Sequence, residues 1–114
     1  MTSTFKPGTT NLVFTAEVNH CIAEDNKFAA FVWKSLARFS RGDWGTVSPE
    51  SWKANDEDLK SLNSGGWYGR ILASYEDWTK GTGGSILEWK IWIIRNTALP
   101  DGTQGVIVQF PNEY

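Results

Sequence analysis

Cysteine and histidine are almost absent from this 114-residue sequence; each occurs once, as the neighbours Cys21 and His20. A single cysteine excludes a disulfide within the chain and any zinc site built from several cysteines. One histidine does not restore such a site, because the usual metal centres need three or four ligands of these types. The adjacent pair could form a thiol nucleophile and its base, but neighbours rarely have that geometry, and an ordinary helix-start position is expected. The sequence therefore predicts no metal.

A strong excess of one charge is also missing, since 11 Lys and Arg oppose 13 Asp and Glu for a net charge of -2. A domain that depends on nucleic-acid phosphates needs a basic excess, so direct nucleic-acid binding is not expected. No apolar run approaches the ~20 residues that span a bilayer, and the start of the chain lacks a signal pattern. We therefore expect no membrane association and a cytosolic location.

Catalytic motifs are absent as well. The sequence has no GxSxG elbow, and the spacing of Asp43, Glu76 and Glu113 does not pair any two of these carboxylates. Lys80 precedes the glycines of segment 81–84, whereas a phosphate-binding loop requires GxxxxGK[ST] between a strand and a helix. These absences predict a protein that is not an enzyme and holds no cofactor.

Aromatic residues, by contrast, are abundant, with 7 Trp, 3 Tyr and 6 Phe. Such side chains serve both cores and contact patches, because Trp and Tyr combine a large apolar area with a polar atom. The length predicts one domain, which we place at residues 12–114. Residues 1–11 are rich in Thr, Ser, Gly and Pro and are expected to be flexible.

The first half of the domain reads as one strand and then helices. Residues 12–18 are β-branched and aromatic, which predicts a strand, and Asn19 is placed to cap a short helical turn. Asp25 or Asn26 is expected to cap the main helix. Its apolar stripe comprises Phe28, Val32, Leu36 and Phe39, widened by Ala29 and Trp33. A hydroxyl, a proline and an acid at Ser48-Pro49-Glu50 predict the start of a second helix that runs to Leu62.

The second half reads as strands over 67–76, 87–96 and 106–110, with a polar glycine-rich loop at 77–85 and a turn at 100–102. Ile71, Ala73 and Tyr75 should share one face of the first of them. The elements together predict an α+β fold: an N-terminal strand, two helices, then a three-stranded antiparallel meander with the helices packed on one face. An uncovered edge of the meander would permit a homodimer.

Two stretches are candidates for contact with a partner. In Ser40–Gly45, we interpret Gly42 as a left-handed helix stop, Asp43 as an acceptor for backbone or arginine groups, and Trp44 as an anchor in the core. The alternative is that this turn itself touches a partner. The second stretch is the helix predicted from Ser48 to Leu62, which is rich in acidic residues. It can simply be a solvated surface, or it can dock on a basic groove of a partner. The candidate contact residues are Arg41, Asp43, Trp44, Glu50, Asp56, Glu57, Asp58 and Trp67.

A distinctive order of short segments runs through residues 18–114. It comprises Asn19 with Ile22-Ala23-Glu24, Phe28 and Val32 with Ser35-Leu36, Ser40–Gly45, Asn55-Asp56, Arg70–Tyr75, Lys90–Ile94 and Phe110–Tyr114. Together they resemble a family of small plasmid-related proteins carried by bacterial plasmids, conjugative elements and phages. Relative to that family, residues 63–68 and 79–87 look like insertions. The resemblance implies an accessory protein of a mobile element that acts inside a bacterial cell.

Accessory proteins in such a setting often block host defences by binding an effector. We therefore expect a non-enzymatic inhibitor, with an anti-CRISPR protein as the best candidate and a CRISPR-Cas nuclease, a CRISPR-Cas complex or a restriction enzyme as its partner. One alternative is a nucleic-acid-binding protein of plasmid maintenance, which would use Lys27, Lys34, Arg38 and Arg41 with Trp33 or Trp44 stacking on bases. The other is a small enzyme or binder that acts on a nucleotide signalling molecule.

Overall fold

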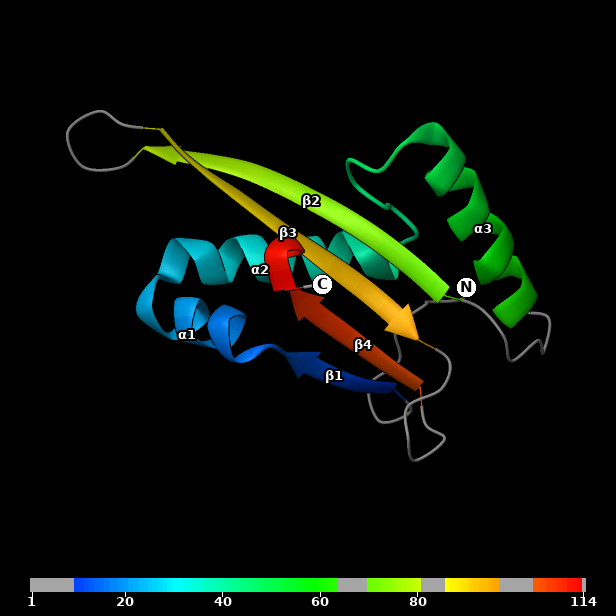
Figure 1. Cartoon of the computed structure of the whole chain (residues 1–114), viewed down its shortest axis with the longest axis horizontal. Helices are drawn as coiled ribbons and strands as arrows, with labels where there is room; N and C mark the ends of the chain where they lie inside the picture. The colour runs from blue at the N-terminus through cyan, green and yellow to red at the C-terminus, as the bar shows by residue number, and fades with distance from the viewer. Residues whose placement is uncertain (1–9, 64–69, 81–85, 97–103, 114) are drawn as a thin grey trace.

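A computed structural model describes residues 10–63, 70–80, 86–96 and 104–113 of the chain, and these residues fold as an α+β unit (Figure 1). The predicted fold class is therefore confirmed. In chain order the elements are β1 (Thr10–Phe14), α1 (Ala16–Glu24), α2 (Asn26–Ser40), α3 (Pro49–Asn63), β2 (Arg70–Lys80), β3 (Ile86–Asn96), β4 (Gln104–Gln109) and the short 3-10 helix η2 (Pro111–Glu113).

The strands form one mixed sheet in the order β1-β4-β3-β2. β2, β3 and β4 are antiparallel neighbours, but β1 joins this group and runs parallel to β4. The predicted three-stranded sheet was therefore one strand too small. The addition has a physical reason, because Leu12 and Phe14 lie opposite Val106 and Val108 and extend the same apolar face.

The first strand ends four residues earlier than predicted, at Phe14. Thr15 stops it by capping α1, since its hydroxyl accepts a hydrogen bond from the Val18 backbone N–H. Asn19, which was predicted to be a cap, lies inside α1. The short helical turn of the prediction is thus a nine-residue helix.

α2 begins as predicted at an Asp25 cap, whose carboxylate accepts from the N–H groups of Lys27 and Phe28. The predicted stripe of Phe28, Val32, Leu36 and Phe39 is buried in the core. Trp33 was wrongly assigned to that stripe. Its side chain is 52% exposed, and its ring packs at nearly a right angle to that of Phe14, at 5.7 Å between centroids.

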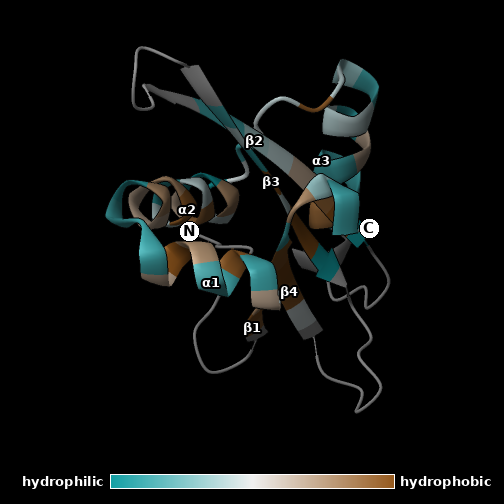
Figure 2. Ribbon diagram, turned by 60° about the vertical axis from the view of Figure 1, so that its left-hand side comes forward, coloured by the Kyte–Doolittle hydropathy of each residue, from teal (hydrophilic) through white to brown (hydrophobic). Residues whose placement is uncertain are grey.

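The helices divide between two sites on the sheet, so the prediction that all of them pack on one face is only partly right. α1 and α2 lie together on one side, whereas α3 lies beside the edge strand β2 (Figures 1 and 2). The face toward α2 carries the buried alternating residues of the strands, including the predicted set Ile71, Ala73 and Tyr75. No helix among the described residues is both long enough and apolar enough to cross a membrane.

β2 is longer than the sequence predicted. The glycine-rich loop was expected from residue 77, but β2 continues to Lys80 because every residue from Arg70 onward pairs with β3. Of the segment 1–11 that was predicted to be flexible, Thr10 and Asn11 belong to β1 instead, because they pair with β4. Residues 1–9 and the predicted turn at 100–102 lie outside the described residues.

Candidate partner-binding surface

The Ser40–Gly45 turn closes α2 and brings the chain to the sheet. Gly42 has a φ of +79°, and the prediction of a left-handed helix stop is confirmed. The Asp43 N–H donates to the Arg38 carbonyl at 3.0 Å and the Gly42 N–H donates to the Phe39 carbonyl at 3.1 Å. These two bonds form a Schellman motif, which satisfies carbonyl groups that the helix end would otherwise leave open.

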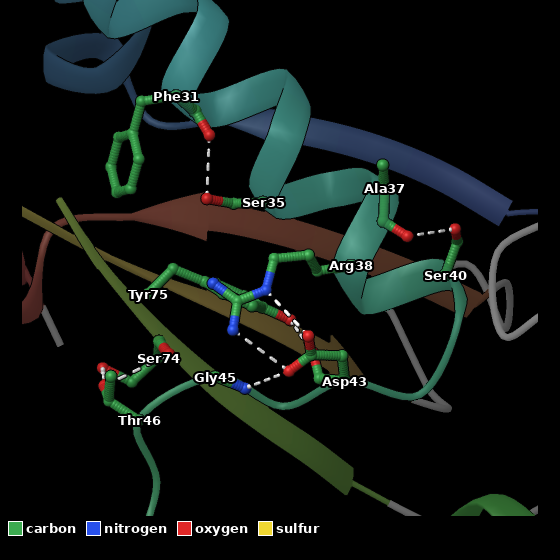
Figure 3. A network of polar contacts seen from close by, with 10 residues as sticks. All are labelled: Phe31, Ser35, Ala37, Arg38, Ser40, Asp43, Gly45, Thr46, Ser74 and Tyr75. Atoms are coloured by element: carbon green, nitrogen blue, oxygen red, sulfur yellow. Dashed lines mark hydrogen bonds and ion pairs between the residues drawn. The ribbon is translucent and has the colours of Figure 1, made fainter.

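Asp43 is the centre of a polar network at this turn (Figure 3). Its carboxylate accepts from Arg38 Nε at 2.8 Å and Nη2 at 3.2 Å, and from the Gly45 N–H at 3.0 Å. The Arg38 hydrogen bond is the main reason that the pKa of Asp43 lies below its ordinary value. The buried Tyr75 hydroxyl donates to the Asp43 carbonyl at 2.7 Å. Asp43 therefore fixes the turn to both α2 and β2.

Gly45 is the point where the turn touches the sheet. The Ser74 N–H donates to the Trp44 carbonyl at 3.2 Å and the Thr46 N–H donates to the Ser74 carbonyl at 2.7 Å, so the segment pairs briefly with β2. Gly45 has a φ of +76°, and a Cβ there would lie 1.8 Å from the Ser74 carbonyl oxygen. Sequence reasoning gave no specific reason for this second glycine. The reason is contact with a strand that lies 29 residues further along the chain.

Trp44 is fully buried, which places it with the core and away from the surface. Its ring meets Phe39 edge-on at 5.4 Å, and its indole Nε1 donates to Asp56 Oδ1 at 2.8 Å. The interpretation of Trp44 as a core anchor is therefore supported. Because its side chain is buried, it is not available for direct contact with a partner. The bond to Asp56 ties the turn to α3.

α3 is held against the edge of β2 by a side chain that sequence reasoning passed over. Asn55 is 5% exposed; its Nδ2 donates to the Leu72 carbonyl at 2.8 Å, and its Oδ1 accepts from the Leu72 N–H at 3.4 Å. The amide thus replaces a neighbouring strand for one residue of β2. The sequence did offer a signal for this role, because Asn55 is a polar residue among the apolar residues that were expected to face the core. At the other end, Ser48 caps the helix as predicted, since its hydroxyl accepts from the Ser51 N–H at 3.2 Å.

The acids of α3 do not share one side of the helix, because Asp58 lines a small hollow together with Arg70 and Leu72 of β2. Glu50, Asp56 and Glu57 are exposed and Asp58 is half-buried. Glu50 and Glu57 are seven residues apart, so they project from the same side about 10 Å apart along the axis. Of the remaining predicted contact residues, Arg41 is exposed and Trp67 lies outside the described residues.

A shallow hollow of about 410 Å³ adjoins these acids. It is lined by the apolar side chains of Val47, Pro49 and the half-buried Trp52, and by Lys53 and Asp56. The Asp56 carboxylate is held by the Trp44 indole. Asp56 thus joins the turn to the hollow, and we call the hollow together with the exposed acids Glu50, Asp56 and Glu57 the α3 surface.

The comparisons found nothing similar. Neither the models of known protein families, nor the curated proteins, nor the solved structures gave a match to this chain. What the α3 surface binds must therefore be inferred from its own charge and shape.

The predicted basic side of α2 is only partly present in the structure. Lys27, Lys34 and Arg41 are exposed and follow one another at seven-residue spacing, with Trp33 beside them. Arg38, the fourth cation of the predicted group, is only partly exposed. Its guanidinium is engaged by Asp43 and lies over the Tyr75 ring at 5.1 Å.

Groups suited to catalysis are sparse in the described part of the chain. It holds no cluster of three or more His, Cys, Asp and Glu side chains that could bind a metal ion. Burial and the nearby acids Glu17, Asp25 and Glu113 raise the pKa of the Cys21 thiol, which disfavours the thiolate that a nucleophile needs. One carboxylate pair was not foreseen: Glu76 and Glu88 lie near each other across β2 and β3, and Glu76 raises the pKa of Glu88.

Proposed function

We propose that this protein is a non-enzymatic inhibitor that binds an effector of a bacterial defence system, and that it belongs to the plasmid-related family that its sequence resembles. An anti-CRISPR protein is the favoured form, acting in the cytoplasm of the host cell. The observation that carries the proposal is the α3 surface, where acids and an apolar hollow lie together on a firmly held helix.

Nucleases that act on DNA or RNA carry basic grooves for the phosphate backbone. A row of carboxylates on a rigid element can occupy such a groove in place of phosphates, and the attraction between opposite charges speeds association. On the α3 surface, Glu50 and Glu57 supply the row. Trp52 and its hollow supply an apolar anchor of the kind that carries most binding energy at interfaces.

Rigidity supports the same interpretation. α3 is joined to the sheet through Asn55 and to the turn through Asp56, so its acids are held in position. A surface that is ordered before binding loses less conformational entropy when a partner docks. Two lysines, Lys53 between the acids and Lys60 just after them, reduce the net charge of the helix and would restrict binding to partners whose own charges match the pattern.

Inhibition can be tested with purified effectors. A panel of CRISPR-Cas nucleases and restriction enzymes is assayed for DNA cleavage with and without the protein, and phage plating is measured in cells that express it. We expect one effector to lose cleavage activity at stoichiometric protein and phage plating to recover against that system. No inhibition across the panel together with no recovery of plating would contradict the proposal.

The second candidate function is nucleic-acid binding through α2, which the exposed Trp33 beside Lys34 favours. The three cations on this face predict a modest salt slope, because each phosphate contact releases about one counterion. A gel-shift series from low to high salt tests it, with Lys34→Gln as the variant. Binding that is lost in the variant and weakens with salt would support this function over the first.

A further inference from the structure

β3 extends well beyond β4. β4 pairs with β3 only along the stretch from Trp92 to Asn96, although β3 begins at Ile86. Figure 1 shows β3 continuing past the end of β4, where the chain turns aside into η2. β2 lines the opposite edge of β3 along its whole length. The first half of β3 therefore has an edge that no strand of the described chain occupies.

The backbone groups at this edge can be assigned from the hydrogen bonds of β2. The N–H and C=O groups of Leu72 and Ser74 point away from β3, since they bond to Asn55 and to the Trp44–Thr46 segment. In an antiparallel pair the residue opposite then points away too, and Trp92 is opposite Ser74. Counting back in steps of two, Lys90 and Glu88 also direct their backbone groups to the open edge.

A hollow of about 610 Å³ lies along this same edge. Two aromatic rings, Trp89 and Phe110, contribute to its lining, and both are fixed by Phe28, at centroid distances of 5.7 and 5.8 Å. Rings held in this way present a constant surface to a ligand. The open backbone of β3 and the aromatic lining therefore adjoin each other.

The polar lining of the hollow is predominantly negative. Glu17, Glu88 and Glu113 contribute three carboxylates, and Lys90 contributes one ammonium. The Glu113 carboxylate is held in place, because its Oε1 accepts from the Thr15 hydroxyl and from the Phe110 N–H, each at 2.8 Å.

We propose that the open edge of β3 binds an extended segment of a partner protein as a fifth strand, with an arginine or lysine of that segment entering the hollow. The strand would lie beside Glu88 and Lys90, where β4 no longer pairs with β3 and η2 borders the hollow, which is the β-augmentation mode of peptide recognition. The cation would lie against Trp89 and Phe110 among the carboxylates, a setting that favours it by cation–π attraction and charge. The proposal rests on the proposed function, in that the ligand is a protein, and adds a second contact region to the α3 surface.

The test uses the intact ¹⁵N-labelled protein and a blocked pentapeptide of sequence Thr-Val-Arg-Val-Thr at millimolar concentration. We expect amide shifts at Glu88 and Lys90 and a shift of the Trp89 indole. The same peptide with glutamine in place of arginine should bind about tenfold more weakly, which matches the loss of one cation–π contact and one ion pair. Glu17→Gln should weaken the arginine peptide severalfold, whereas Glu50→Gln on α3 should leave its binding unchanged.

Each alternative outcome is decisive. Absence of shifts at Glu88 and Lys90 overturns the proposal, as does equal binding of the arginine and glutamine peptides. Shifts at these residues that appear on raising the protein concentration without peptide would show that a second copy of the chain takes the edge, and would also overturn it. The titration contains no effector protein. A negative titration would therefore refute strand binding at β3 without bearing on inhibition, which the cleavage assay tests.

Discussion

The contact between Gly45 and β2 makes a sharp prediction about stability. Gly45→Ala places a Cβ at a φ of +76°, 1.8 Å from the Ser74 carbonyl oxygen and 2.8 Å from Tyr75 Cδ1. The obstacle is backbone within a paired strand, which cannot rotate aside as a flexible side chain could. The turn must therefore move away from β2.

The expected loss follows from what that movement breaks. A left-handed conformation costs an alanine about 1 to 2 kcal/mol, and the two hydrogen bonds between Ser74 and the turn contribute about 1 kcal/mol each. The sum is about 3 to 4 kcal/mol, a large share of the roughly 5 to 15 kcal/mol that stabilises a domain of this kind. Gly45→Ala should therefore be folded but clearly less stable than the parent.

Gly42→Ala is a matched control, because Gly42 has nearly the same φ of +79° but its added Cβ would meet no atom closer than 3.9 Å. This variant should lose only the conformational share, about 1 to 2 kcal/mol. Urea denaturation of both variants and the parent measures the difference. If the two variants were equally stable, the contact with β2 would not be the reason for the second glycine.

Three further predictions concern the same region. Asn55→Ala should lose about 1 to 3 kcal/mol in urea denaturation, because it leaves the Leu72 N–H and C=O without the amide; an equally stable variant would contradict this. Trp44→Phe removes the bond to Asp56 and also leaves a space in the core, because phenylalanine is smaller than the fully buried indole, so it should lose about 2 to 3 kcal/mol; an equally stable variant would contradict the role of Trp44 as a core anchor. The lowered pKa of Asp43 stabilises the fold fully above its ordinary value of 3.8, and this contribution is lost as pH falls below it; Asp43→Asn should therefore show less acid destabilisation between neutral pH and pH 2 than the parent.

Sequence patterns predicted the local features of this fold well. The Asp25 cap, the left-handed Gly42, the Ser48 cap and the apolar stripe of α2 each depend on residues within one or two helical turns. Such features are encoded by spacing and cap chemistry, so they can be read without a structure.

The features that the sequence did not predict depend on contacts between distant segments. The parallel pairing of β1 with β4 joins residues almost 100 positions apart, and nothing in the strand itself selects parallel or antiparallel neighbours. Gly45 and Asn55 are specified by β2, which follows them in the chain. Trp33 was misassigned because an aromatic residue beside an apolar stripe resembles a core residue until the helix is oriented.

The most direct test of the central claim reverses the charge of the α3 surface. Glu50→Lys combined with Glu57→Lys is compared with the parent in binding to, and inhibition of, the effector found in the cleavage panel, and Glu24→Lys, an exposed acid on α1, serves as control. We predict that the double variant associates about tenfold more slowly at low salt and loses inhibition, while the control retains both. Full inhibition by the double variant would show that the α3 surface is not the binding site.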